Sequence, residues 1–105
     1  MRQTQLTLQQ EISISQVLRV YGKQFKQIKR RFSDGQDGRC AMGVILSYCG
    51  WDGKLDSLSE TSASWRAAQR TLRKIRISRG SIIDRNDSGY TFDEIADYID
   101  CRSNR

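Results

Sequence analysis

The chain has 105 residues, a net charge of +6 and a hydrophobic content of 37%, which is typical of one small globular domain with a modest core. Its three cysteines do not suit a disulfide framework, and the lack of histidine argues against zinc binding and excludes histidine-dependent catalysis. No apolar stretch has the length of a signal peptide or a membrane span, so we expect a cytoplasmic protein. We also expect no metal or cofactor, because the sequence has no recognisable ligand set or cofactor signature.

Positive charge is concentrated in two segments. Residues 1 to 33 carry seven basic residues and one acidic residue, and residues 61 to 81 carry six basic residues and no acidic residue. Residues 34 to 60 and residues 82 to 105 each carry a net charge of −3. The whole basic excess therefore belongs to two parts of the chain.

The first 32 residues predict an arm followed by a basic helix. Residues 1 to 13 alternate apolar and polar residues as a strand does, yet they are rich in glutamine and could begin a helix, so we treat them as a partly ordered arm. Ser13 and Gln16 have the spacing of a capping box, which predicts a helix over residues 14 to 32. Its apolar side chains share one arc and are Val17, Leu18, Tyr21, Phe25, Ile28 and Phe32. Its basic side chains share a separate arc and are Arg19, Lys23, Lys26 and Arg30.

Residues 39 to 49 predict a central helix. They include the only long apolar run in the chain, and their apolar side chains fall on every side of a helix, which is typical of a buried element. The run is too short for the ~20 residues that span a bilayer. Asp37 is expected to cap the start of this helix, and Gly50 is expected to end it as residue C′.

A second basic helix is predicted over residues 63 to 77, after an acidic loop in which Leu55 and Leu58 fold inward. Ser62 or Ser64 is expected to cap it. Its buried stripe consists of Trp65, Ala68, Leu72 and Ile75. Another face carries Arg66, Arg70, Arg73 and Lys74. Gly80 is then expected to interrupt the chain, and residues 84 to 89 to form a turn.

The last helix has the clearest local signal. Thr91 and Glu94 form a capping box that predicts a helix over residues 92 to 101, while residues 102 to 105 are expected to fray. The apolar stripe of this helix consists of Phe92, Ile95, Ala96 and Ile99. We therefore predict an all-α fold, a single compact domain over residues 14 to 101 with about four helices around the buried helix 39 to 49.

A possible calcium loop has a simpler structural interpretation. Asp84, Asn86, Ser88 and Gly89 match positions of an EF-hand loop, but Ile95 occupies the position of the bidentate glutamate. We therefore favour a turn followed by the capping box.

Cys40 also has two interpretations. A thiol near the start of a helix can have a lowered pKa and become reactive. No neighbouring base is identifiable in the sequence, and a small buried apolar residue explains this position equally well.

Two segments, residues 38 to 43 (GRCAMG) and residues 86 to 95 (NDSGYTFDEI), resemble a family of short uncharacterised bacterial and phage proteins. The family pattern is a C-A-L-G-A segment, a helix, and N-D near a T-x-x-E-[VI] helix. The resemblance covers roughly residues 38 to 99 and departs from the pattern at Met42 and Val44. It implies a compact helical domain without an assigned activity. It also suggests that Asn86 and Asp87 hydrogen-bond the start of one helix.

The basic faces give the functional prediction. Cationic side chains on rigid helices can neutralise several phosphates and release their counterions. We predict a small non-enzymatic binding module that contacts DNA or RNA phosphates independently of sequence. The predicted contact residues are Arg19, Lys23, Lys26, Arg30, Arg66, Arg70, Arg73 and Lys74. The alternative is an interaction module for an acidic protein or for a second copy of the chain. No catalytic residue is predicted, because no carboxylate has an identifiable partner for acid–base chemistry.

Overall fold

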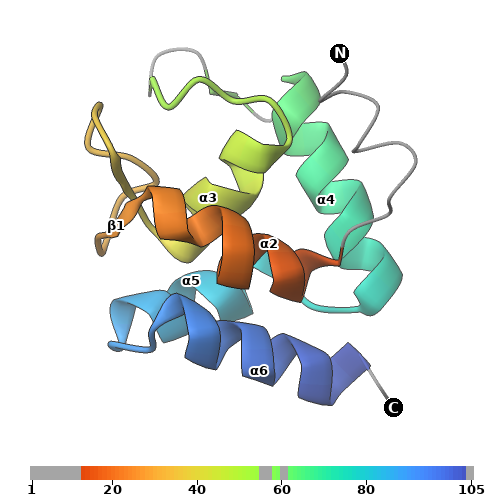
Figure 1. The fold of residues 1–105 in the computed structure, drawn as a ribbon. Coiled ribbons are helices and arrows are strands. Elements are labelled where there is room, and N and C mark those ends of the chain that lie inside the picture. Colours follow the sequence, from red (N-terminus) through yellow and green to blue (C-terminus); the bar gives the residue numbers. More distant parts are fainter. Residues whose placement is uncertain (1–12, 55–57, 60–61, 104–105) are drawn as a thin grey trace.

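The computed structural model describes residues 13–54, 58–59 and 62–103 (Figure 1). In chain order its elements are α2 (Ile14–Val20), the 3-10 turn η1 (Tyr21–Gln24), β1 (Lys26–Gln27), β2 (Gly38–Arg39), α3 (Ala41–Tyr48), α4 (Ala63–Ile75), α5 (Arg79–Asp87) and α6 (Phe92–Ser103). The predicted mainly helical character is confirmed. The all-α fold of four helices is wrong, because the described residues form five α-helices and one pair of parallel strands. The predicted arm, except for Ser13, lies outside the described residues.

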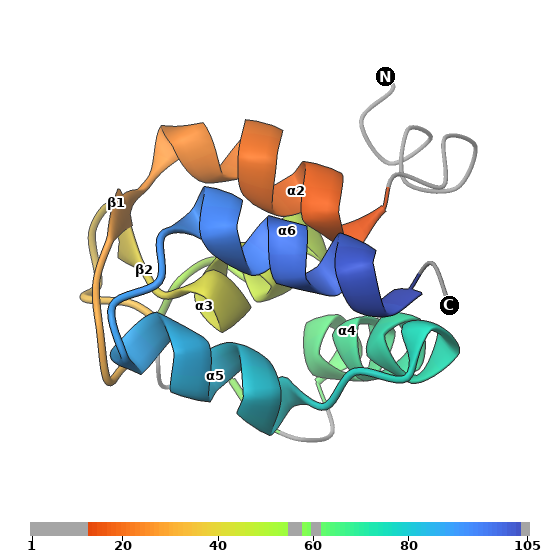
Figure 2. The same cartoon turned by 90° about the horizontal axis from the view of Figure 1, so that it is seen from below.

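Helix α3 lies at the centre of the fold. Every residue of α3 before its last, Tyr48, is buried, as predicted for a helix that is apolar all round. Helices α2, α4 and α5 each pack against α3, while α2 and α6 lie side by side and run in opposite directions (Figures 1 and 2). Buried side chains from all five helices join one hydrophobic cluster. The outer helices are thus placed by one shared core.

The start of α3 differs from the prediction. Cys40 is the N-cap, and its Sγ accepts a hydrogen bond from the Gly43 N–H at 3.4 Å. The predicted cap, Asp37, is separated from the helix by the two residues of β2 and by Cys40. At the other end, Gly50 follows the C-cap residue with a φ of 109°, which confirms the predicted stop.

The predicted helix over residues 14 to 32 is wrong beyond its first part. Helix α2 ends at Val20, the chain tightens into η1, and Phe25 is extended with φ −124° and ψ 152°. Strand β1 then pairs in parallel with β2, with Lys26 opposite Gly38 and Gln27 opposite Arg39. These strand bonds satisfy backbone groups that the longer helix would have paired internally.

The break after α2 depends on a close contact with α6. A Cβ on Gly22 would lie 2.9 Å from the Phe92 ring, so the backbone of η1 rests directly on the first residue of α6. Glycine is also a poor helix former, which lowers the cost of leaving the helical conformation here. Phe25 and Phe32 still pack against the core. These two predicted apolar side chains therefore face inward as expected, but the backbone that carries them is not α-helical.

Helix α5 was not predicted. Helix α4 ends at Ile75, and Arg76 turns the chain in the left-handed conformation with a φ of 59°. Gly80, expected to interrupt the chain, lies inside α5, and the expected turn is reduced to residues 88 and 89. Ile82 and Asn86 are both buried on α5, so tertiary packing overrides the weak helix propensity of this segment.

Most of the remaining helix signals agree with the structure. Thr91 Oγ1 accepts from the Glu94 N–H at 3.1 Å, and Glu94 Oε1 accepts from the Thr91 N–H at 2.9 Å, which confirms the capping box. Helix α6 continues to Ser103, beyond the predicted end, so Arg102 belongs to the helix. Ser62 occupies the N-cap position of α4, but its side chain makes no capping hydrogen bond and instead donates to the Ser59 carbonyl. Leu58 packs against the core, while Leu55 lies outside the described residues. No helix in this part of the chain is long and apolar enough to cross a membrane.

Candidate nucleic-acid interface

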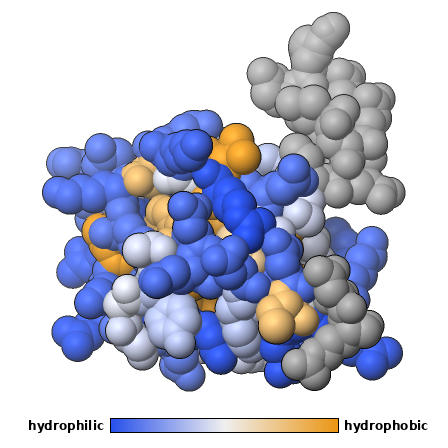
Figure 3. All heavy atoms as spheres, turned by 60° about the horizontal axis from the view of Figure 1, so that its bottom comes forward, coloured by the Kyte–Doolittle hydropathy of each residue, from blue (hydrophilic) through white to orange (hydrophobic). Residues whose placement is uncertain are grey.

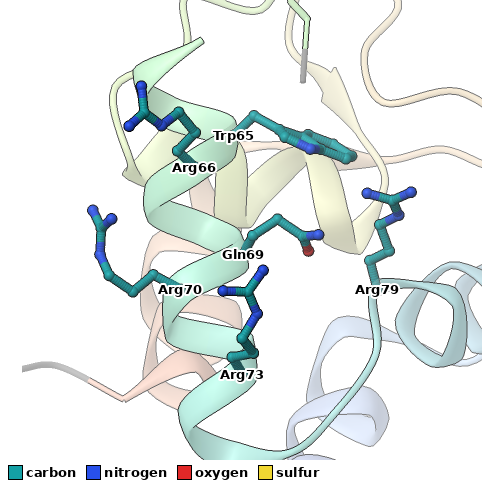
Figure 4. Close-up of a pocket in the computed structure, with 6 residues that line it drawn as sticks. All are labelled: Trp65, Arg66, Gln69, Arg70, Arg73 and Arg79. Atoms are coloured by element: carbon teal, nitrogen blue, oxygen red, sulfur yellow. The ribbon is translucent and has the colours of Figure 1, made fainter. Parts of the chain in front are cut away.

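The second basic face forms as predicted on α4. Trp65, Ala68 and Leu72 are buried against the core, which directs the residues between them outward. A depression of about 340 Å³ lies along the exposed side and is lined by Trp65, Arg66, Gln69, Arg70, Arg73 and Arg79 (Figure 4). We call Arg66, Arg70, Arg73 and Arg79 the arginine cluster. Three of its members come from α4 and one comes from the first residue of α5.

Arg79 was missed by the sequence-based prediction. Its guanidinium carbon lies 4.9 Å from the centre of the Trp65 ring, in a cation–π contact. The turn at Arg76 and the buried side chain of Ile77 bring the start of α5 back beside α4. The basic composition of residues 61 to 81 already includes Arg79, but the helical face calculated for residues 63 to 77 could not include it.

Among the described residues, the arginine cluster has little negative charge near it. None of their carboxylates lines the depression, and α4 contains no acidic residue. Within the described residues, Arg66, Arg70 and Arg73 form no ion pair. Lys74 is exposed on the same helix but does not line the depression. This surface can therefore attract a polyanion with most of its charge available.

The first basic set does not form a face. Arg19 on α2 donates to Asp100 at 2.8 Å and to Asp97 at 2.5 Å, both on α6. Lys23 lies in η1 and Lys26 in β1, where both side chains are exposed. Arg30 follows in a loop with a φ of 69°, so the four residues lie on four different kinds of backbone.

The ion pair between Arg19 and Asp100 shifts the pKa of both of these groups. Its hydrogen bonds to Asp100 and then to Asp97 raise the pKa of Arg19. The pKa of Asp100 is lowered, first by a hydrogen bond from Ser15 and then by the bond from Arg19. Arg19 is thus occupied within the fold.

The two predicted basic faces do not converge. Strand β1 and helix α4 lie on opposite sides of the molecule in both ribbon views (Figures 1 and 2). Lys26 and the arginine cluster therefore do not form one continuous positive surface. The candidate interface consists of the arginine cluster with Lys74 beside it.

Apolar surface offers no comparable site in the described residues. The only large hydrophobic residues exposed there are Val20 and Tyr90, 65% and 42% exposed. The face drawn in Figure 3 is mostly hydrophilic, with small separate apolar patches. Large apolar patches usually mark protein-binding faces, so recognition by charge fits this surface better.

Asn86 joins three segments below the surface. Its Oδ1 accepts from the Ala41 N–H at 2.9 Å and from Gln27 Nε2 at 2.8 Å, and its Nδ2 donates to the Ile28 carbonyl at 2.8 Å. The expected hydrogen bond between Asn86 and the start of a helix is confirmed, because Ala41 is the first residue of α3. Asp87 instead accepts from the Arg30 N–H at 2.8 Å, so its expected contact with a helix start is wrong.

Arg39 is another buried polar residue, and its role was not predicted from the sequence. It is buried, and its guanidinium donates to Ser47 Oγ, Ser33 Oγ and two backbone carbonyls at 2.8–3.0 Å. The same group lies 4.7 Å from the centre of the Phe25 ring. These neutral partners identify it as part of the packing around α3 and not of the surface site.

The cysteines and acidic residues show no reactive arrangement in the described part of the chain. Burial raises the pKa of both Cys40 and Cys49, which opposes thiolate formation. Asp84 and Asn86 lie in α5, so the EF-hand loop considered from the sequence is not formed. The described residues contain no group of three metal-ligating side chains.

Comparisons with family models, with curated proteins and with solved structures find no match. The resemblance of residues 38 to 99 to the bacterial and phage family therefore stays a prediction. What can be proposed about function rests on the arginine cluster and its surroundings.

Proposed function

We propose that this chain is a non-enzymatic module that binds nucleic-acid phosphates through the arginine cluster, independently of base sequence. The observation that carries the proposal is that four arginines from two helices line one depression, which no carboxylate of the described residues lines. Guanidinium groups match phosphate oxygens because they donate two parallel hydrogen bonds from a planar fork. The exposed ends of Arg66, Arg70 and Arg73 can reach an extended polyanion without a change in the fold.

Sequence independence follows from which groups the site offers. Bases are distinguished by bonds to their edges or by stacking, whereas phosphate contacts carry no sequence information. Trp65 is only 7% exposed and is already in contact with Arg79, so it has no free face for a base. The cluster therefore offers charge and hydrogen-bond donors to the backbone.

The number of arginines sets the expected salt dependence. Four phosphate contacts give a slope of log K against log salt of about −3 on a single strand, since each contact contributes about −0.7. A fourfold rise in salt should then lower affinity about fiftyfold. A track of eight cationic residues would give a slope of about −6 and a loss of more than about a thousandfold.

Fluorescence anisotropy with labelled oligonucleotides tests the proposal. We expect the double variant Arg70→Gln, Arg73→Gln to bind about tenfold more weakly or worse, with a salt slope reduced by about 1.5. The matched control is Lys23→Gln, Lys26→Gln, which removes the same charge from exposed side chains of η1 and β1. It should change affinity by less than about twofold.

Two outcomes would contradict the proposal. Equal weakening by both double variants would show that general charge, and not the arginine cluster, determines binding. Absence of binding at low salt would reject nucleic acid as the partner and would favour the alternative of an acidic protein, whose complex would survive nuclease treatment.

A further inference from the structure

We infer that the depression between α4 and the start of α5 is a pocket for the phosphodiester backbone of a single-stranded nucleic acid, with Arg79 as its fixed guanidinium. This inference rests on the proposed function and adds a substrate class and a binding residue to it.

The first reason is the shape of the site. Gln69, Arg73 and Arg79 turn toward the same space from two elements, whereas Arg66 and Arg70 project from the other side of α4 (Figure 4). The arginine cluster therefore has an inner part inside the depression and an outer part along the helix. At about 340 Å³, the depression is comparable with the smaller ligand pockets of ~300–1,000 Å³.

The second reason is the stiffness of the two possible ligands. Duplex DNA is stiff over about 50 nm, and its phosphates lie on the convex outside of a cylinder. Such a surface can meet the outer arginines on the ridge of α4, but it cannot bend into a depression of this size. A single strand has a flexible backbone that can follow a cationic groove, so one of its phosphates can enter between Arg73 and Arg79.

The third reason is that Arg79 is positioned before any ligand arrives. Its guanidinium lies against the Trp65 ring, and the next residues of the chain are held by the Ser78 cap, whose Oγ accepts from the Ser81 N–H at 3.1 Å. The buried Ile77 fixes the chain on the other side of Ser78. A donor held in place loses less conformational entropy on binding than a free surface arginine.

Arg79 also covers Trp65, so a purely packing role must be separated from a binding role. Arg79→Lys keeps the charge but loses the planar fork and its stacking. Gln69→Ala removes a side chain that turns into the depression without touching the contact between Arg79 and Trp65. A packing role predicts a lower melting temperature for Arg79→Lys and the same relative loss of affinity for every nucleic acid.

The experiment measures affinity for an oligothymidylate of about 12 nucleotides and for a duplex of the same length. We expect the wild-type chain to bind the single strand about tenfold more tightly than the duplex. Arg79→Lys should weaken single-strand binding about tenfold and Gln69→Ala about threefold, while both leave duplex binding within about twofold. Lys26→Gln, the control from β1, should leave the ratio of the two affinities unchanged.

The possible failures are distinguishable. Binding of neither ligand would overturn the proposed function itself. Equal binding of both ligands, or equal weakening of both by Arg79→Lys and Gln69→Ala, would overturn the single-strand pocket and leave the phosphate-binding function standing.

Discussion

Arginine has opposite roles in two regions of the molecule, which are the contact between α2 and α6 and the exposed side of α4. On α2, Arg19 donates to Asp97 and Asp100, so its charge is paired with carboxylates of the same chain. On α4, Arg66, Arg70 and Arg73 have no such partner in the described residues. The two regions teach that an arginine stripe becomes a candidate binding surface only where the fold brings no carboxylate to it.

The difference arises from tertiary structure, not from local spacing. Both stripes have helical spacing in the sequence, and both belong to segments with a net charge of +6. The partners of Arg19 lie 78 and 81 residues further along the chain. The antiparallel packing of α6 on α2 is therefore what separates a structural arginine from an available one (Figure 2).

The largest expected effect concerns Asn86, which joins α5 to β1 and to the start of α3, the helix against which α2 and α4 both pack. Asn86→Ala leaves a buried N–H and a buried carbonyl without partners. We expect a loss of about 2–4 kcal/mol of stability and a melting temperature lower by roughly 10–20 °C. Thermal unfolding followed by circular dichroism measures this.

The neighbouring variant Asp87→Asn is the matched control. Its amide oxygen can still accept from the Arg30 N–H, so the melting temperature should change by about 2 °C or less. A melting temperature of Asn86→Ala equal to that of the wild type would show that the three hydrogen bonds of Asn86 contribute little to the fold.

The sequence predicts those features of the fold whose residues lie close together along the chain, and it does not predict those that depend on distant segments. The buried helix α3 and the capping box of α6 were predictable because their residues lie within a few positions of one another. The end of α2 was not, because it depends on Gly22 resting on Phe92 and on the pairing of β1 with β2. Apolar residues with helical spacing can also lie in a turn or a strand when a distant segment supplies backbone hydrogen bonds that replace those of the helix.

Helix α5 and the arginine cluster show the same limit. Gly80 and the polar residues after Ile83 indicate a turn by composition, and only the burial of Ile82 and Asn86 makes the segment helical. The outward face of α4 was predictable because Trp65 and Leu72 fix its inner side. The contribution of Arg79 was not, because the turn at Arg76 that brings it back has no glycine to signal it.

A smaller effect should follow from placing a carboxylate in the arginine cluster. Gln69→Glu changes an amide to a carboxylate three and four positions from Arg66 and Arg73, where it can pair with either. The α4 surface would then resemble the surroundings of Arg19. We expect affinity for an oligonucleotide to fall about tenfold while the melting temperature stays the same or rises slightly.

Gln24→Glu is the control for this change, because Gln24 is an exposed glutamine of η1. It introduces the same charge away from the arginine cluster and should weaken binding by less than about twofold. If Gln69→Glu and Gln24→Glu weakened binding equally, the position of the carboxylate would not matter and the contrast between the two regions would fail.

The smallest expected effect tests the α2 side by pH. The pKa of Asp100 is lowered below its ordinary value of 3.8 because its charged form is stabilised by Ser15 and Arg19. A carboxylate of this kind contributes stability above its unfolded-state pKa, and the contribution is lost as the pH falls through the lower folded-state pKa. Arg19, whose pKa is raised, stays charged throughout this range, so protonation of Asp100 alone breaks the pairing. Asp100→Asn should therefore lower the melting temperature by a few degrees near pH 6, and this difference should shrink as the pH falls toward 3 and below. A difference that stayed constant with pH would mean that Asp100 acts through packing. The engagement of Arg19 within the fold would then depend on its ion pair with Asp97 alone.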